Sequence, residues 1–163
     1  MSLMKAILQI YFFFELFVVG TQTVSAATLT TGEIAALIRP IEHHAMEYGE
    51  GKIKAYVFID PKCPYSRSFI SMIHDNQKML GMYHYYIFFY ELKRFNTHKT
   101  IGTIYSVPSP LNAMFEIMVA GKNIKPPAAL SPQVEEKIGD IENVAQQLNV
   151  TKRPYLIIAK EWN

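Results

Sequence analysis

The single cysteine of this chain, Cys63, lies in the sequence DPKCPYS (residues 60–66) and is the residue best suited to chemistry. An apolar, β-prone run stops at Asp60-Pro61 and an amphipathic run follows Pro64, which predicts a strand, a tight turn and a helix. Pro64 suits the first helical position, because its missing N–H would have no intrahelical partner there. Cys63 then becomes the helix N-cap, where unpaired N–H groups and the helix dipole stabilise a thiolate over a thiol. The pattern predicts a nucleophilic cysteine.

A second feature of the motif is Ser66, which occupies the position where a dithiol redox motif would carry its second sulfur. A serine hydroxyl can donate a hydrogen bond to the Cys63 sulfur and stabilise the thiolate without competing for it. A lone thiolate can attack a disulfide and form a mixed disulfide, but it cannot then expel its client by closing its own ring. We therefore expect Cys63 and Ser66 to be the catalytic residues, with Pro64 and Tyr65 completing the active-site motif.

Composition and the N-terminal residues indicate one exported domain. The chain has 163 residues and a net charge of +2 without a long basic run, so it has room for one domain and no electrostatic footprint for nucleic acid. Lys5, the apolar runs at 6–14 and 16–20 and the small residues Val24 and Ala26 form the three parts of a secretory signal peptide, cleaved after Ala26. An uncleaved membrane anchor is the alternative, although Glu15 disfavours it. Either way the domain would face an oxidising compartment where disulfides form, and there one cysteine can only act on other molecules.

No cofactor or metal ion is implied by the sequence. The adjacent His43 and His44 lie about 100° apart if helical, and no cysteine or acidic cluster completes a metal site around them. A solvated helix surface is the expected role of both histidines.

The remaining patterns predict an alternation of helices and strands. A hydroxyl three residues before Glu33 forms a capping-box start for an N-terminal helix. The nearly continuous apolar run at 53–59 predicts a central buried strand, and the aromatic run at 83–92 predicts a second strand parallel to it. The other expected elements are a helix from Pro64 to Gly81, a short helix near residues 101–104, helices opening at Ser109-Pro110 and Ser131-Pro132, and an edge strand after Pro154.

Three separated segments, at residues 58–65, 112–122 and 147–154, resemble the catalytic domain of the bacterial periplasmic DsbC/DsbG-type disulfide isomerases. The resemblance runs from about residue 52 to 159 in the same order, and it implies an α/β, thioredoxin-like fold with a helical insertion. The implied organisation is a signal peptide at 1–26, a helix and linker at 27–51, and the thioredoxin-like domain at 52–163 with the insertion at about 96–149.

The resemblance also implies roles for Arg153 and Pro154. Pro154 would be the cis-proline that lies against the reactive cysteine, and the backbone at Arg153 would pair with an extended substrate peptide. An ordinary trans proline at the start of an edge strand is the alternative.

The sequence departs from the family pattern in several places. Ser66 replaces the second active-site cysteine, and Ser106 stands where related isomerases carry a further structural cysteine. Residues 27–51 are too few for the family's dimerisation domain. The printed sequence also stops before the last strand and helix that normally complete the sheet, so the expected fold is C-terminally shortened with an open edge.

Two functions remain open from the sequence. The first is a monothiol protein of disulfide isomerase type that binds unfolded or cysteine-containing clients. Another thiol or a membrane reductase would then release the client from its mixed disulfide with Cys63. The second is a non-catalytic module that holds an extended segment of a partner between Tyr65 and Pro154, within an envelope assembly or secretion machinery. A glutathione-dependent thiol transferase is a third possibility that the long insertion disfavours.

Overall fold

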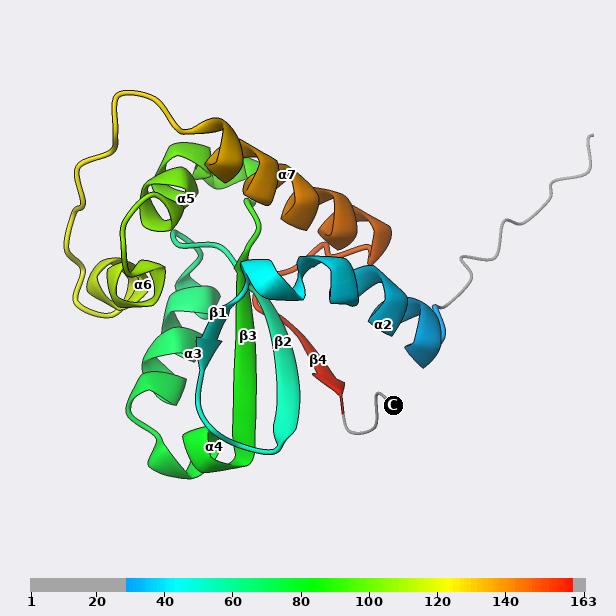
Figure 1. Ribbon diagram of the computed structural model, residues 1–163. Coiled ribbons are helices and arrows are strands. Elements are labelled where there is room, and N and C mark those ends of the chain that lie inside the picture. The colour runs from blue at the N-terminus through cyan, green and yellow to red at the C-terminus, as the bar shows by residue number, and fades with distance from the viewer. Residues whose placement is uncertain (1–28, 160–163) are drawn as a thin grey trace, which may run out of the picture.

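The computed structural model describes residues 29–159, which form a four-stranded mixed sheet with helices on both faces (Figure 1). The strand order is β1-β3-β2-β4, so β1 and β4 are the edges. The elements in chain order are α2 (Thr31–Ile38), the 3-10 helix η1 (Arg39–His44), β1 (Met46–Tyr48), β2 (Ile53–Ile59), α3 (Pro64–His74), α4 (Gln77–Met82), β3 (Tyr83–Phe89), the 3-10 helix η2 (Lys93–Phe95), α5 (His98–Tyr105), α6 (Pro110–Met118), α7 (Pro132–Gln147) and β4 (Tyr155–Ala159).

The centre of the fold is a parallel βαβ unit, as the sequence predicted. Strand β2 pairs with β3 in parallel from Ile53 opposite Tyr83 to Ile59 opposite Phe89, and α3 and α4 form the crossover. Strand β4 runs antiparallel to β2 on its other side. The C-terminal end of β2 therefore lies inside the sheet and leads directly into the cysteine turn.

The prediction of a single helix from Pro64 to Gly81 is wrong, because the structure has two helices, α3 and α4, in this segment. Asp75 and Asn76 leave helical geometry, and the Asn76 side chain accepts a hydrogen bond from Met79 N at 3.1 Å to start α4. Asp and Asn favour such breaks since their short side chains compete for backbone hydrogen bonds. Gly81, expected as the helix end, lies within α4.

The first strand, β1, was missed by the sequence analysis. Met46–Tyr48 pairs antiparallel with β3, from Met46 opposite Ile87 to Tyr48 opposite Tyr85. Three residues are too short for an alternating pattern to be recognised. Part of the segment expected as helix and linker thus belongs to the sheet.

The other helical predictions agree with the structure. Thr30 and Glu33 form the expected capping box at α2. Helix α7 begins where it was predicted, after Ser131, whose side chain accepts a hydrogen bond from Val134 N at 3.3 Å. Helix α6 begins at Pro110, as predicted, with Met114 and Met118 buried and Leu111 and Phe115 half-buried.

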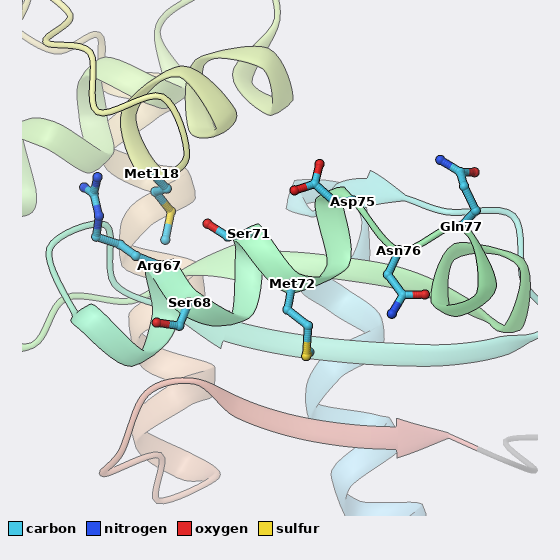
Figure 2. A pocket seen from close by; sticks show the side chains of 8 residues that line it. All are labelled: Arg67, Ser68, Ser71, Met72, Asp75, Asn76, Gln77 and Met118. Atoms are coloured by element: carbon cyan, nitrogen blue, oxygen red, sulfur yellow. The ribbon is translucent and has the colours of Figure 1, made fainter.

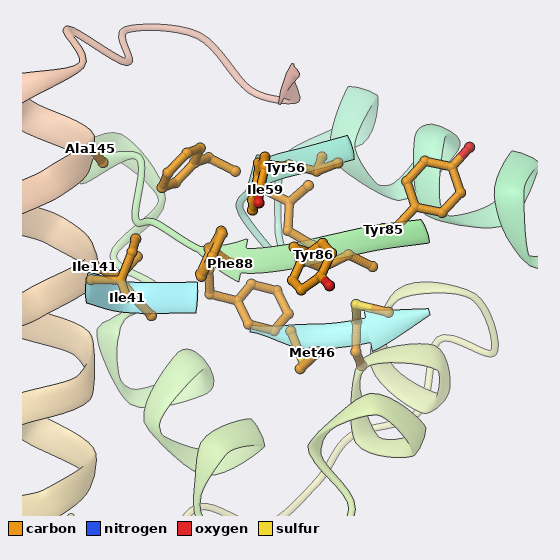
Figure 3. Packing of buried hydrophobic residues seen from close by; sticks show 14 of the residues in the cluster. Ile41, Met46, Tyr56, Ile59, Tyr85, Tyr86, Phe88, Ile141 and Ala145 are labelled. Carbon is orange, nitrogen blue, oxygen red and sulfur yellow. The ribbon is translucent and has the colours of Figure 1, made fainter. Parts of the chain in front are cut away.

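Buried hydrophobic side chains from the strands and the helices that pack on them form one continuous core (Figure 3). Phe58 stacks on Phe88 across β2 and β3, and Ile41 of η1 and Ile141 of α7 close one side of the core. Within residues 29–159 no helix is long and apolar enough to cross a membrane. The predicted signal peptide lies outside the described residues.

Two glycines should respond oppositely to alanine. A Cβ on Gly51 would approach the backbone of Met82 and Tyr83 to 2.0 and 2.1 Å, whereas a Cβ on Gly139, in the interior of α7, would meet nothing within 4 Å. We expect Gly51→Ala to lower the free energy of unfolding by about 2 kcal/mol or more through overpacking. Gly139→Ala should raise it by about 0.5–1 kcal/mol through helix propensity. Urea unfolding followed by circular dichroism measures both, and equal effects would contradict this packing.

Candidate active site around Cys63

Cys63 is the N-cap of α3, as its sequence context predicted. Its backbone is extended (φ −71°, ψ 120°), Pro64 is the first helical residue, and Arg67 N donates to Cys63 O at 3.0 Å to close the first turn. Cys63 N donates to Asp60 O at 3.1 Å, which closes the turn between β2 and α3. The sulfur is thus placed by local structure at the end of a central strand and the start of a helix.

The sulfur lies against the segment that precedes β4. Cys63 Sγ donates to Arg153 O at 3.7 Å, across 90 positions of sequence, and the Arg153–Pro154 peptide bond is cis. Cys63 is only 1% exposed. The fold therefore brings Cys63, Arg153 and Pro154 together, with the sulfur facing a backbone carbonyl rather than solvent.

Ser66 is close to the cysteine in the chain but does not contact its sulfur through a hydrogen bond. Its side chain is fully buried, and Ser66 Oγ accepts from Asp60 N at 3.2 Å. Among the described residues no hydrogen bond joins Ser66 to Cys63 Sγ, so the prediction that Ser66 donates to this sulfur is wrong. Ser66 instead fixes the end of β2 to the first turn of α3.

A buried carboxylate that the sequence analysis did not assign organises this region. Asp60 is 0% exposed and accepts from Lys62 N at 2.8 Å, Leu92 N at 2.6 Å and Thr97 Oγ1 at 2.8 Å. The bond to Lys62 forms an Asx turn, a signal available in the sequence at Asp-Pro-Lys. The bonds to Leu92 and Thr97 join segments more than 30 residues away, and no local pattern indicates them.

A buried cation lies on the other side of the site. Arg153 is 7% exposed, and its guanidinium donates to Tyr90 O (3.0 Å), Glu91 O (3.1 Å) and Val150 O (3.1 Å) and stacks at 3.9 Å on the Tyr90 ring. Burial lowers the pKa of this guanidinium from its ordinary value, while Tyr90, Asp60 and Cys63 act in the opposite direction. The sequence analysis assigned Arg153 a backbone role only. Its side chain locks the segment before Pro154 to the end of β3.

Solvent reaches this region mainly at the start of α3. Tyr65 is 74% exposed, Pro64 is exposed and Pro154 is half-buried. A shallow depression follows the outer side of α3 from Arg67 past Ser71 to Asn76 and reaches Met118 of α6 (Figure 2). Its lining contains neither Cys63 nor Pro154, so this depression is not a cavity around the sulfur. No group of three or more possible metal ligands occurs in residues 29–159.

Comparison with known proteins supports the fold. No protein-family model and no curated protein matches the sequence. Among solved structures, the chain is similar to a disulfide interchange protein from Neisseria gonorrhoeae (TM-score 0.54, 21% identity, covering 71% of this chain and 80% of that one). It is also similar to the catalytic domain of Proteus mirabilis ScsC (0.60, 14%, 79% and 86%) and to Helicobacter pylori DsbG (0.57, 15%, 77% and 60%).

These likenesses establish the class of fold. The chain has a thioredoxin fold, as the sequence predicted, and one of these neighbours at low sequence identity is a disulfide interchange protein.

The Asp60 carboxylate can be tested by an isosteric change. Asn at this position keeps one acceptor oxygen but places an NH₂ group against at least one donor, so Asp60→Asn should lower the free energy of unfolding by about 3 kcal/mol. Thr97→Val removes a single donor and should cost about 1–2 kcal/mol. Urea unfolding gives both values, with the exposed Asp75→Asn as the matched control. A stability of Asp60→Asn equal to that of the control would show that the network contributes nothing.

Proposed function

We propose that this chain is an exported, periplasmic thioredoxin-fold protein that acts on client cysteines through a single thiol, Cys63. The observation that carries the proposal is the position of Cys63 at the N-terminus of α3, with its sulfur 3.7 Å from the carbonyl before cis-Pro154. The unpaired N–H groups of a helix N-terminus surround this position, and a cysteine sulfur exchanges disulfides by acting as a nucleophile.

The chemistry needs no cofactor. The Cys63 thiolate attacks one sulfur of a client disulfide, forming a Cys63–client disulfide while the other client sulfur leaves as a thiolate. A client thiolate then attacks the client sulfur of this mixed disulfide, which forms a new client disulfide and returns the Cys63 thiolate. The net result is isomerisation, without net oxidation or reduction. If no client thiol is in reach, a small thiol or a partner reductase must release Cys63.

The residues around the sulfur fit different parts of this proposal. The backbone at Arg153 would pair with an extended client segment, as the resemblance stated above implies, and the exposed Tyr65 lies nearby at the start of α3. Ser66, which bonds Asp60 N, supports the turn rather than the thiolate. Because position 66 carries no thiol, the mixed disulfide with a client would be long-lived, which suits a protein that holds or isomerises its clients.

One observation favours the second function, a non-catalytic module that binds an extended segment of a partner in an envelope assembly. Cys63 is 1% exposed, so a client disulfide can reach Sγ only after the side chain or the Pro154 segment moves outward. A binding module would need no such movement, since Tyr65 and the backbone near Pro154 would suffice.

Alkylation of Cys63 separates the two functions. If Cys63 is a catalytic nucleophile, its sulfur must become accessible in the folded protein, so iodoacetamide should modify the native protein at neutral pH at a rate at least about equal to that of the urea-unfolded chain. Mass spectrometry follows the modification, and Cys63→Ser is the control for labelling elsewhere. A native thiol that is protected until the chain unfolds would contradict the catalytic function. Full cellular activity of Cys63→Ala would then support the binding module.

A further inference from the structure

Three separate segments of the chain meet at the end of the sheet that holds Cys63. Strands β2 and β3 finish at this end and β4 begins there, because β3 runs parallel and β4 antiparallel to β2 (Figure 1). The three segments are residues 60–67, 90–95 and 150–154. Hydrogen bonds of the Asp60 carboxylate and the Arg153 guanidinium join them. Charged residues from all three segments therefore gather at one site, although no basic run in the sequence indicates this.

Five basic residues of these segments form what we call the basic rim. They are Lys62, Arg67, Lys93, Arg94 and Lys152, of which Arg67 is half-buried and the others are exposed. Lys62 Nζ donates to Phe95 O at 3.3 Å, and the Arg94 guanidinium lies 4.8 Å from the centre of the Phe95 ring. Arg67 donates to Pro61 O at 3.4 Å, in the cysteine turn. Lys152 directly precedes Arg153, whose carbonyl lies 3.7 Å from Cys63 Sγ.

The carboxylates near the basic rim are turned to other partners. Asp60 is 0% exposed, and Glu91 Oε1 accepts from Thr97 N and His98 N at the start of α5. Glu135 of α7 is engaged by His98 at 3.0 Å. Within residues 29–159 no ion pair includes a residue of the rim. The site therefore presents an unbalanced positive surface to a molecule that approaches Cys63.

We propose that the Cys63 site recognises a client polypeptide whose cysteine is flanked on both sides by acidic residues. This inference rests on the proposed function of Cys63. Charge complementarity raises the rate at which two molecules meet and disfavours partners of the same charge. Basic residues on three segments exceed what a small thiol with few carboxylates can pair, whereas an extended client can place carboxylates on both sides of its cysteine. An anionic membrane offers the same charge but no disulfide for Cys63.

Four chromogenic disulfides test this charge preference. Each carries 5-thio-2-nitrobenzoate on a cysteine: three peptides of equal length flank the cysteine with Glu, Gln or Lys on both sides, and the fourth is glutathione. Attack by the Cys63 thiolate forms the Cys63–peptide disulfide and releases the coloured thiolate, so one absorbance reports all four rates. We expect the Glu peptide to react about tenfold faster than the Gln peptide, a difference of about 1.4 kcal/mol, and the Lys peptide to react slowest. In about 1 M salt, which screens charges beyond about 3 Å, these rates should converge.

Variants assign the preference to the basic rim. Lys62→Gln and Lys152→Gln, on different segments, should each lower the ratio of the Glu-peptide rate to the Gln-peptide rate about twofold. This ratio cancels any change in the reactivity of the thiol itself. Lys78→Gln is the matched control, because Lys78 is exposed on α4, outside the rim, and loses the same charge. Equal rates for the Glu and Gln peptides, or a ratio that neither rim variant changes, would overturn the inference. A glutathione rate equal to that of the Glu peptide would assign the rim to a small thiol and overturn the client.

The basic rim can also be tested without the thiol chemistry. If Cys63 reacts with none of the disulfides, the proposed function fails, and fluorescence anisotropy then uses Cys63→Ser with a labelled Glu peptide that carries serine in place of its cysteine. Binding that Lys62→Gln weakens and Lys78→Gln retains would support recognition of an acidic segment, whereas no binding would overturn it. Sedimentation with phosphatidylglycerol vesicles tests the membrane. Vesicle binding that exceeds peptide binding and that Lys62→Gln weakens would assign the rim to an anionic membrane and overturn the client.

Discussion

The buried carboxylate of Asp60 is the interaction on which the geometry of the site depends. It accepts hydrogen bonds from the cysteine turn, from the segment after β3 and from the start of α5, through Lys62, Leu92 and Thr97. Removing a charge from water is costly unless its hydrogen bonds are made elsewhere. Three separate segments satisfy this carboxylate together, and each is consequently fixed relative to Cys63.

The buried guanidinium of Arg153 fixes the other side of the site. The Arg153 guanidinium is held by the carbonyls of Tyr90, Glu91 and Val150 rather than by a carboxylate in direct contact. Tyr90 follows β3, and Leu92, which bonds Asp60, is two residues further along the chain. The end of β3 is thus tied to both sides of the sulfur, which explains how a turn and a proline segment about 90 residues apart can meet.

The two edge strands of the sheet, β1 and β4, are covered to different extents by the rest of the described chain. Strand β1 contacts α6, and the Tyr48 side chain packs on Phe115, so that edge lies beneath part of the helical insertion. Strand β4 carries aliphatic side chains that no described element covers. At the start of β4 the fold places the Cys63 thiol beside the cis peptide bond between Arg153 and Pro154.

Local chemistry alone determined much of this protein. The capping box at Thr30, the proline that starts α3 and the apolar run of β2 each depend on residues within one or two turns of chain, so the sequence predicted them correctly. It also placed Cys63 at a helix N-cap, because that position needs only the strand before it and Pro64 after it. The tertiary structure decided what depends on distant partners. It turned Ser66 toward Asp60 N, divided the expected helix at Asn76, recruited residues 46–48 as an edge strand and buried Arg153 among carbonyls. Each of these outcomes satisfies backbone N–H or C=O groups that lacked a hydrogen-bond partner once the sheet had formed. A local sequence pattern does not indicate which groups these are.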